Sequence, residues 1–286
     1  MSNVPNPNVA IYAGGNPASL SISTDLFNAI SAATYSTVIL WAAHIDSAGD
    51  IGINGTKVAT GGQFSAEASD WANLITGLPS TVERIELCIG GDSTSFKNIQ
   101  KLIHDYGPTE TNPLYGNLQV LQQTLGLDAI NYDDEKVYDL SSSTKLAQMC
   151  VSLNMNVSIC PYTKQSYWNS LIGTINDAYP GTVDAVYLQC YDGGASNSPV
   201  QWTQALSKTG LQIVPGLWAR HGSNCESGSA ADQVQDKISG WQKHAIEEST
   251  SLAGGFIYSG TNITSCPGSG SFVDYSNAII NGIAEA

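Results

Sequence analysis

The 286-residue sequence predicts a single domain, residues 1–286, folded as a (β/α)8 TIM barrel of the α/β class, with a small hairpin inserted after the second strand. Two observations support this prediction. Apolar strand-like runs alternate with amphipathic helical stretches eight times, and no linker or composition break interrupts them. The runs are continuously apolar, as expected of parallel strands buried on both faces. Eight repeats favour a closed barrel over an open, doubly wound sheet.

The strands are predicted at apolar runs, in chain order 8–14, 37–45, 84–91, 127–135, 156–162, 184–192, 211–218 and 254–260. The helices are predicted from Thr24 onwards and at 65–78, 94–106, 113–125, 140–153, 164–177, 199–208, 230–247 and 272–284. The Thr24 side chain is expected to cap the first helix. Asn54 and Gly55, between β-type residues, predict the inserted hairpin.

The composition narrows the class of partner. The chain has 25 acidic and 11 basic residues, a net charge of -14 and a pI near 4.4. Such a chain repels nucleic acid and anionic membranes, so we expect neither as a partner and favour a neutral ligand such as a sugar. No stretch approaches the roughly 18 apolar residues that span a bilayer. The composition leans towards an extracellular protein, but the first 15 residues do not read as a signal peptide, which leaves localisation open. The oligomeric state is not predicted.

The six cysteines do not form the pattern of a disulfide scaffold. Cys88, Cys160 and Cys190 lie inside apolar runs and are expected to be buried free thiols. Cys225 and Cys266 lie in loops rich in Gly and Ser, where they either pair or stay free. The sequence has no C-x-x-C or H-E-x-x-H motif and its four histidines are scattered, so we expect no metal site and no cofactor.

The predicted fourth strand ends in three adjacent acids, within LDAINYDDE at 127–135. Alternation along a strand places Asn131, Asp133 and Glu135 on one face, which we expect to point into the barrel mouth. Asp134 then faces away and is expected to cap the next helix. Two close, partly desolvated carboxyls cannot both ionise easily, so one keeps a proton and can act as a general acid. A solvated strand end without a function is the alternative that the spacing alone leaves open.

The segment D-x-x-N-x-D-x-E at 128–135 resembles the D-x-x-D-x-D-x-E signature of glycoside hydrolase family 18, which includes chitinases and endo-β-N-acetylglucosaminidases. Three further segments resemble family landmarks in the same order. They are VAIYAGGN at 9–16, similar to the first strand of class III chitinases, LCIGG at 87–91, similar to S-x-G-G with Cys88 in place of Ser, and LQCYD at 188–192, similar to Q-x-Y-[ND].

This resemblance implies a substrate-assisted hydrolase of β-1,4 bonds next to N-acetylglucosamine, in chitin or the N-glycan core. Glu135 would be the general acid, and the substrate's own N-acetyl oxygen would be the nucleophile. Asp133 would orient the acetamido group and stabilise the oxazolinium ion, and Tyr191 would hydrogen-bond the same group. The substrate-binding residues would be Tyr12, Gly91, Asn131, Gln189, Asp192, Trp218 and Tyr258.

Two departures from the family pattern bear on activity. Asn131 stands where active members carry an Asp, and we expect it to hydrogen-bond Asp133 without taking its proton, which would slow the enzyme or change its pH dependence. The last strand, GGFIYSG, lacks the family's Trp, so either Tyr258 or Ser259 takes that place. Trp218 either supplies aromatic surface instead or packs in the core.

The short stretch at 219–253 leaves no room for the insertion that deepens the cleft in some members, which favours an open groove and endo-acting cleavage. The alternative is a non-catalytic, chitinase-like protein that binds carbohydrate. Retention of Glu135 favours the enzyme, whereas Asn131 and the missing Trp favour the binding protein.

Overall fold

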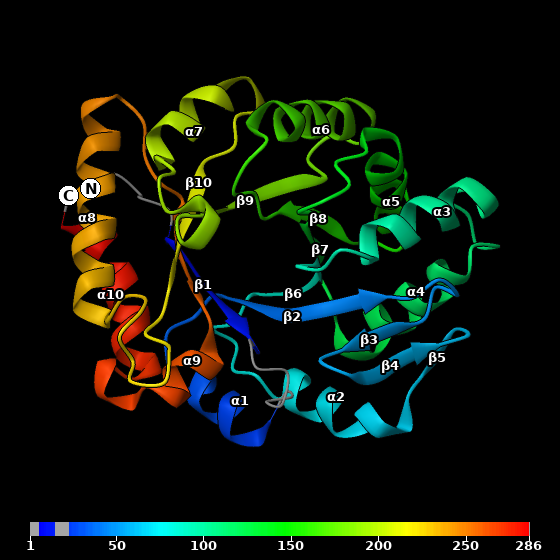
Figure 1. The fold of residues 1–286 in the computed structure, drawn as a ribbon, viewed down its shortest axis with the longest axis horizontal. Coiled ribbons are helices and arrows are strands. Elements are labelled where there is room, and N and C mark those ends of the chain that lie inside the picture. Colours follow the sequence, from blue (N-terminus) through cyan, green and yellow to red (C-terminus); the bar gives the residue numbers. More distant parts are fainter. Residues whose placement is uncertain (1–5, 15–22, 286) are drawn as a thin grey trace.

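A computed structural model describes residues 6–14 and 23–285 of the chain. Gly15 and Asn16, which end the first landmark segment, lie outside these residues. Eight parallel strands form a closed ring, because the first strand pairs with both the second and the last (Figure 1). The ring strands are β1 (Asn8–Ala13), β2 (Thr37–Ile45), β6 (Arg84–Gly90), β7 (Ala129–Asp133), β8 (Asn156–Ile159), β9 (Val183–Gln189), β10 (Ile213–Trp218) and β11 (Gly254–Tyr258). The predicted (β/α)8 barrel is therefore confirmed.

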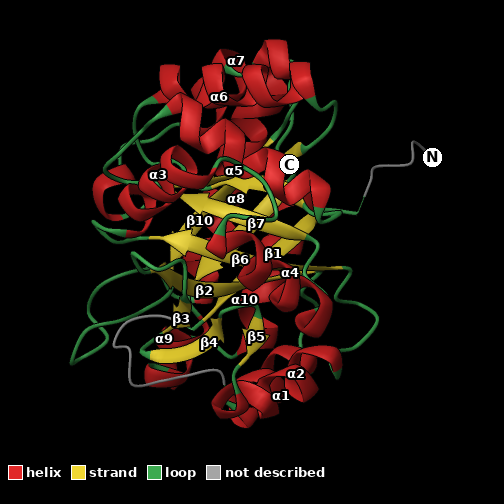
Figure 2. Ribbon diagram, turned by 90° about the vertical axis from the view of Figure 1, so that its right-hand side faces the viewer, coloured by secondary structure: helices red, strands yellow, loops and turns green. Residues whose placement is uncertain are grey.

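Helices surround the ring (Figure 2). They are α1 (Thr24–Ser31), α2 (Ser69–Thr76), α3 (Ser95–Tyr106), α4 (Pro113–Leu125), α5 (Leu140–Ser152), α6 (Gln165–Ala178), α7 (Pro199–Ala205), α8 (Ala231–Glu247), α9 (Gly260–Ser265) and α10 (Phe272–Ala284). The short α9 was not predicted: its sequence, GTNITS, has no apolar stripe. No helix in the described part of the chain is long and apolar enough to cross a membrane.

The predicted hairpin lies outside the ring, next to β2. β3 (Ile51–Ile53) pairs antiparallel with β2 and with β4 (Thr56–Thr60). Asn54 and Gly55 join the two strands with φ of 49° and 86°, the left-handed region that a tight hairpin turn requires. A third short strand, β5 (Gln63–Phe64), extends the hairpin and was not predicted.

Two predicted helix caps are wrong. Ser23, not Thr24, caps α1, and its hydroxyl accepts a hydrogen bond from the Leu26 N–H. Asp139 caps α5 by accepting from the Ser142 N–H. Asp134 faces away from the barrel axis as predicted, but its carboxylate accepts hydrogen bonds from the main-chain N–H groups of residues 136–138. It therefore orders the loop after β7 and does not cap the helix that follows.

The side chains of the strands fill two apolar layers, as alternation requires. Outward-facing residues pack with the helices in one large core. Inward-facing residues, among them Tyr12, Ile39 and Tyr187, fill the barrel, and the ring of Phe256 packs against both tyrosines. Gly216 makes room for that ring, because a Cβ there would lie 1.9 Å from Phe256 Cζ. Each fully buried large side chain stabilises the fold by about 1.5 to 3 kcal/mol relative to an exposed one.

The cysteines divide into two groups. Cys225 and Cys266, whose pairing the sequence left open, form a disulfide that joins the loop after β10 to the end of α9. Cys88, Cys150, Cys160 and Cys190 are buried free thiols. For three of these (Cys88, Cys160 and Cys190), this is the state that their place in apolar runs predicted.

Candidate active site

A cleft of about 120 Å³ opens at the carboxyl ends of the ring strands, where (β/α)8 barrels place their active sites. Its walls come from strands of the ring or the loops that directly follow them. The lining residues are Tyr12, Trp41, Gly91, Asp133, Glu135, Cys160, Gln189, Tyr191, Asp192, Trp218 and Tyr258.

Asp133 is the last residue of β7 and is 6% exposed. Burial raises the pKa of its carboxyl well above the usual value, and the nearby Glu135 and Asp134 carboxylates raise it further. Gln189 Nε2 donates a hydrogen bond to Asp133 Oδ1 at 3.1 Å, which favours the charged form and opposes these effects. Burial and the two neighbouring carboxylates outweigh this hydrogen bond, so the pKa of Asp133 is raised and its neutral form is favoured over a wider pH range than in water.

Glu135 lies two residues beyond Asp133, on the same side of the chain, and is half-buried. Burial raises the pKa of Glu135, Lys136 opposes that rise, and Asp192 adds to it. Two carboxyls with raised pKa values therefore line one small cleft. Such a pair can hold a proton and deliver it to a bound oxygen atom, which is the chemistry of a general acid.

Gly91 lets the chain pass close to the acid. Its φ is +64°, and its N–H donates to the main-chain oxygen of Asp133 at 3.0 Å. A Cβ at this position would lie 3.2 Å from Asp133 Oδ2 and 3.4 Å from the Trp41 ring. A larger residue would therefore push against both walls of the cleft.

Aromatic rings form the floor, with Tyr258 at the centre. Its ring stacks on Tyr191 with centroids 5.7 Å apart and planes 14° apart, and it meets Tyr12, Trp41 and Trp218 edge to face. Rings in this arrangement offer an apolar surface with polar edges, which suits the face of a sugar.

Two alternatives that the sequence left open are decided by this floor. Tyr258 lines the cleft, whereas the hydroxyl of the fully buried Ser259 is within hydrogen-bonding distance of Asn262 Oδ1 and the Thr261 hydroxyl. Trp218 also lines the cleft. Its indole N–H donates to Asn262, and its ring stacks on that of His221 with centroids 4.0 Å apart.

The peptide bonds Trp41–Ala42 and Tyr258–Ser259, which belong to two residues of the cleft, are cis.

Asn131 does not line the cleft, and the expected hydrogen bond to Asp133 was wrong. Asn131 is fully buried beneath the floor, where Nδ2 donates to Ser158 Oγ at 2.8 Å and to Glu86 at 3.4 Å. Its Oδ1 accepts from the Tyr12 hydroxyl at 3.1 Å. One amide N–H bonds the acid on the neighbouring strand β6 and the other bonds Ser158, whose hydroxyl donates to the same acid, so both N–H bonds are used away from Asp133.

Nine of the ten predicted site residues thus lie around one cleft, and Asn131 lies below it. Trp41 and Cys160 also line the cleft but were not predicted to do so. Trp41 has the same parity as the inward-facing Ile39, which was the available signal. The register of β2 against β6 shifts between Leu40 and Ala43, so simple alternation stops being reliable at this point.

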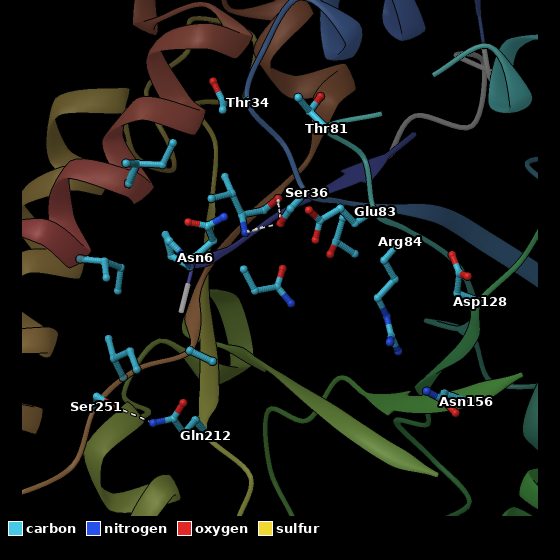
Figure 3. A pocket seen from close by; sticks show the side chains of 18 of the residues that line it. Asn6, Thr34, Ser36, Thr81, Glu83, Arg84, Asp128, Asn156, Gln212 and Ser251 are labelled. Carbon is cyan, nitrogen blue, oxygen red and sulfur yellow. Dashed lines mark hydrogen bonds between the residues drawn. The ribbon is translucent and has the colours of Figure 1, made fainter. Parts of the chain in front are cut away.

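A larger cavity, about 990 Å³, lies at the amino ends of the strands and includes the first residues of β1, β2, β6 and β8 (Figure 3). Neutral side chains dominate its lining, and Gln212 there donates a hydrogen bond to Ser251. Of its charged residues, Arg84 pairs with Glu86 and Asp184. The acid pair lies at the other end of the barrel, so the smaller cleft is the candidate active site.

Among residues 6–14 and 23–285, no three His, Cys, Asp or Glu side chains are grouped as metal ligands. Comparison of the sequence with protein-family models and with curated proteins gives no match. The fold, in contrast, has many similar solved structures.

A chitinase from Chromobacterium violaceum has a TM-score of 0.59 at 12% identity, over 98% of this chain and 100% of that one. Human YKL-39, described as a pseudo-chitinase that retains chitooligosaccharide binding, has a TM-score of 0.61 at 10% identity, over 97% and 100%. A family 18 chitinase from Cycas revoluta, in complex with (GlcNAc)4, has a TM-score of 0.58 at 11% identity, over 94% and 99%. At these identities the likeness shows the fold, which is the fold of family 18 chitinases and chitinase-like proteins.

Proposed function

We propose that this protein hydrolyses β-1,4 bonds next to N-acetylglucosamine, in chitin or in the N-glycan core, with Glu135 as the general acid. One observation carries the proposal: two carboxyls with raised pKa values line an aromatic cleft at the carboxyl end of a chitinase-like barrel. The net negative charge of the chain agrees with a neutral rather than an anionic polymer as substrate.

The reaction begins when Glu135 transfers its proton to the glycosidic oxygen and the bond from that oxygen to the anomeric carbon breaks. The substrate's acetamido oxygen attacks the same carbon and forms an oxazolinium ion, so no protein carboxylate attacks. A water molecule then attacks the anomeric carbon, and the bond from that carbon to the acetamido oxygen breaks, which opens the oxazolinium ring. The water gives one proton to the Glu135 carboxylate. The two displacements together retain the configuration at the anomeric carbon.

Asp133 stabilises the intermediate. The oxazolinium ion is positively charged, and a positive charge beside Asp133 stabilises its anionic form. Substrate therefore favours ionised Asp133 while Glu135 keeps the proton that it delivers. Gln189 supports this state, because its amide N–H already points at the Asp133 carboxyl. Tyr191 and Tyr258 hold the acetamido group and the sugar ring over the floor.

A second function is a carbohydrate-binding protein without turnover. The neutral Asn131 and the absence of a Trp from β11 favour it, and YKL-39 shares this fold as a pseudo-chitinase that binds chitooligosaccharides. In this case the acid pair is retained without a leaving group to protonate, and the aromatic floor alone does the binding.

The two functions separate in one experiment. Wild type, Glu135→Gln and a control, Glu110→Gln, which changes an exposed acid between α3 and α4, are assayed on chitotetraose and on a high-mannose glycoprotein. Binding of chitotetraose is titrated in parallel. Loss of a general acid lowers turnover by about 10²- to 10⁴-fold.

Turnover by wild type and Glu110→Gln, lost in Glu135→Gln with binding retained, supports the hydrolase. Tight binding without turnover in all three proteins supports the binding protein and contradicts the hydrolase. Failure of all three to bind or cleave either substrate contradicts both.

A further inference from the structure

A fully buried acid, Glu86 on β6, lies inside the barrel beneath the cleft, and the proposed mechanism does not use it. Four donors converge on its carboxylate. Arg84 Nε donates at 2.5 Å and the Tyr187 hydroxyl at 3.0 Å, both to Oε1. The Ser158 hydroxyl and the amide of Asn131 donate to Oε2. A charge buried this deeply is tolerated because it is paired and fully hydrogen-bonded.

Arg84 ties this acid to the amino end of the barrel. Its two terminal nitrogens each donate to Asp184 at 2.7 Å, and Asp184 also accepts from Asn156 at 2.6 Å. Burial disfavours charge on the guanidinium, but Glu86 and Asp184 outweigh burial and raise the pKa of Arg84. Figure 3 shows Arg84 and Asn156 beside the larger cavity at the amino ends of the strands. The polar contacts therefore run from that cavity to the underside of the cleft.

Glu86 decides which way the Asn131 amide faces. Both N–H bonds of that amide are used on Ser158 and Glu86, so only Oδ1 remains for the Tyr12 hydroxyl. Because an amide has donors at one end and an acceptor at the other, the acid fixes its orientation. The Tyr12 hydroxyl also lies 3.0 Å from Cys160 Sγ, and both of these residues line the cleft.

We propose that Glu86 is a positioning residue of the cleft and that the amide at position 131 is required because this acid lies beneath it. Glu86 acts through Asn131, which holds Tyr12 and so the part of the floor beside Asp133. The effect on substrate rests on the proposed function, whereas the pairing of an acid with an amide does not.

The chemistry of the pair explains why an Asp cannot simply replace Asn131. In the Asn131→Asp variant, the new carboxylate would face Glu86 Oε2, which lies 3.4 Å from the present amide nitrogen, and like charges at that distance inside a protein repel strongly. The new side chain would also have no N–H to give to Ser158. If position 86 carried Gln, its amide could donate to the new acid, and the Ser158 hydroxyl could reverse its hydrogen bond.

The test is a double-mutant cycle of wild type, Glu86→Gln, Asn131→Asp and the variant with both substitutions. Glu110→Gln is the control for removing an acid from the surface. Melting temperature is measured for each protein, and chitotetraose affinity and kcat are measured at about 20 °C, well below the usual melting range of such domains. Soluble yield is recorded for variants that fold poorly.

We expect Asn131→Asp to lower the melting temperature by about 5 °C or more and to weaken affinity about tenfold. Adding Glu86→Gln should recover most of the melting temperature and bring the affinity to within about threefold of wild type. Affinity is the readout specific to positioning, since a purely structural role would change the melting temperature and leave binding by folded protein unchanged.

A double variant that is no better than Asn131→Asp in yield, melting temperature or affinity overturns the proposal, and so does recovery of the melting temperature without recovery of affinity. A wild type that neither binds nor cleaves chitotetraose contradicts the proposed function instead. The thermal cycle needs no substrate, so in that case it still tests the pairing of residues 86 and 131.

Discussion

Gln189 Nε2 lies 3.1 Å from Asp133 Oδ1 and 3.1 Å from the main-chain oxygen of Cys160, so one amide from β9 contacts both Asp133 and the residue that follows β8. This amide gives Asp133 a donor that supports its charged form. Gln189 therefore favours ionised Asp133, whereas burial and the neighbouring carboxylates favour its protonated form.

Replacing Gln189 with Leu removes this donor while keeping a similar volume. A hydrogen bond to a charged group contributes about 1.5 to 3 kcal/mol, so kcat should fall by about 10- to 100-fold. Steady-state kinetics on chitotetraose measure the effect, and Gln201→Leu, an exposed position on α7, should leave kcat unchanged. A kcat within about twofold of wild type for Gln189→Leu would contradict the role given to this amide.

The charges around Glu135 predict two opposite changes in the pH dependence of kcat. The proposed acid must be protonated, so activity falls as pH rises through its pKa. Asp192 raises the pKa of Glu135, so Asp192→Asn should move the loss of activity to lower pH. Lys136 lowers the same pKa, so Lys136→Gln should move the loss of activity to higher pH. Both shifts should shrink at about 1 M salt. If both variants shift in the same direction, Glu135 does not control the loss of kcat at high pH.

Asp133 should reduce stability at neutral pH. The pKa of Asp133 is raised in the folded state, so the stability that its protonated carboxyl contributes is fully present below the unfolded-state pKa near 4. That stability is lost as the pH rises through the folded-state pKa. Asp133→Asn should therefore melt above wild type at about pH 7, by about 2 to 4 °C for each kcal/mol removed. The difference should disappear near pH 4, as calorimetry across this range can test. An equal difference at both pH values would argue against a raised pKa.

The ring of Tyr258, rather than its hydroxyl, should bind the sugar. Tyr258→Phe should keep chitotetraose affinity within about twofold, whereas Tyr258→Ala, which removes the central ring of the floor, should weaken it by about tenfold. Isothermal titration of both variants measures these affinities. Equal losses in both variants would instead assign binding to the hydroxyl.

The Cys225–Cys266 disulfide closes a loop with a sequence separation of 41 residues. Such a link stabilises the fold by about 4 kcal/mol through the entropy of the unfolded chain. Replacing both cysteines with Ser should lower the melting temperature by about 10 °C. Reductant should lower that of wild type by a similar amount and leave that of the variant unchanged. A further loss in the variant would point to another reducible group.

Much of the fold and cleft follows from local patterns in the sequence. Continuous apolar runs located the ring strands, and their alternation separated the inward-facing Asp133 from Asp134, which holds the next loop. These predictions succeed because strand geometry repeats every two residues whatever lies nearby. The cap of α1 was placed one residue too late because Ser23 and Thr24 have the same chemistry, and only the backbone decides where a helix begins.

The environment of Asn131 could not be predicted in the same way. Its partners, Glu86, Ser158 and Tyr12, come from three other strands, and only the register between strands brings them to one level of the barrel. The sequence shows an amide in place of an acid. It does not show that another acid lies one strand away, with its charge directed at the same point.

The contact between positions 86 and 131 also has an evolutionary consequence. On this proposal, a carboxylate is tolerated at one of the two positions only while the other is neutral, so gaining an acid at 131 before losing the acid at 86 passes through a less stable intermediate. Among sequences that share this barrel, the two positions should covary. Lineages with an acid at 131 should carry an uncharged residue at 86, and lineages with an acid at 86 should keep the amide.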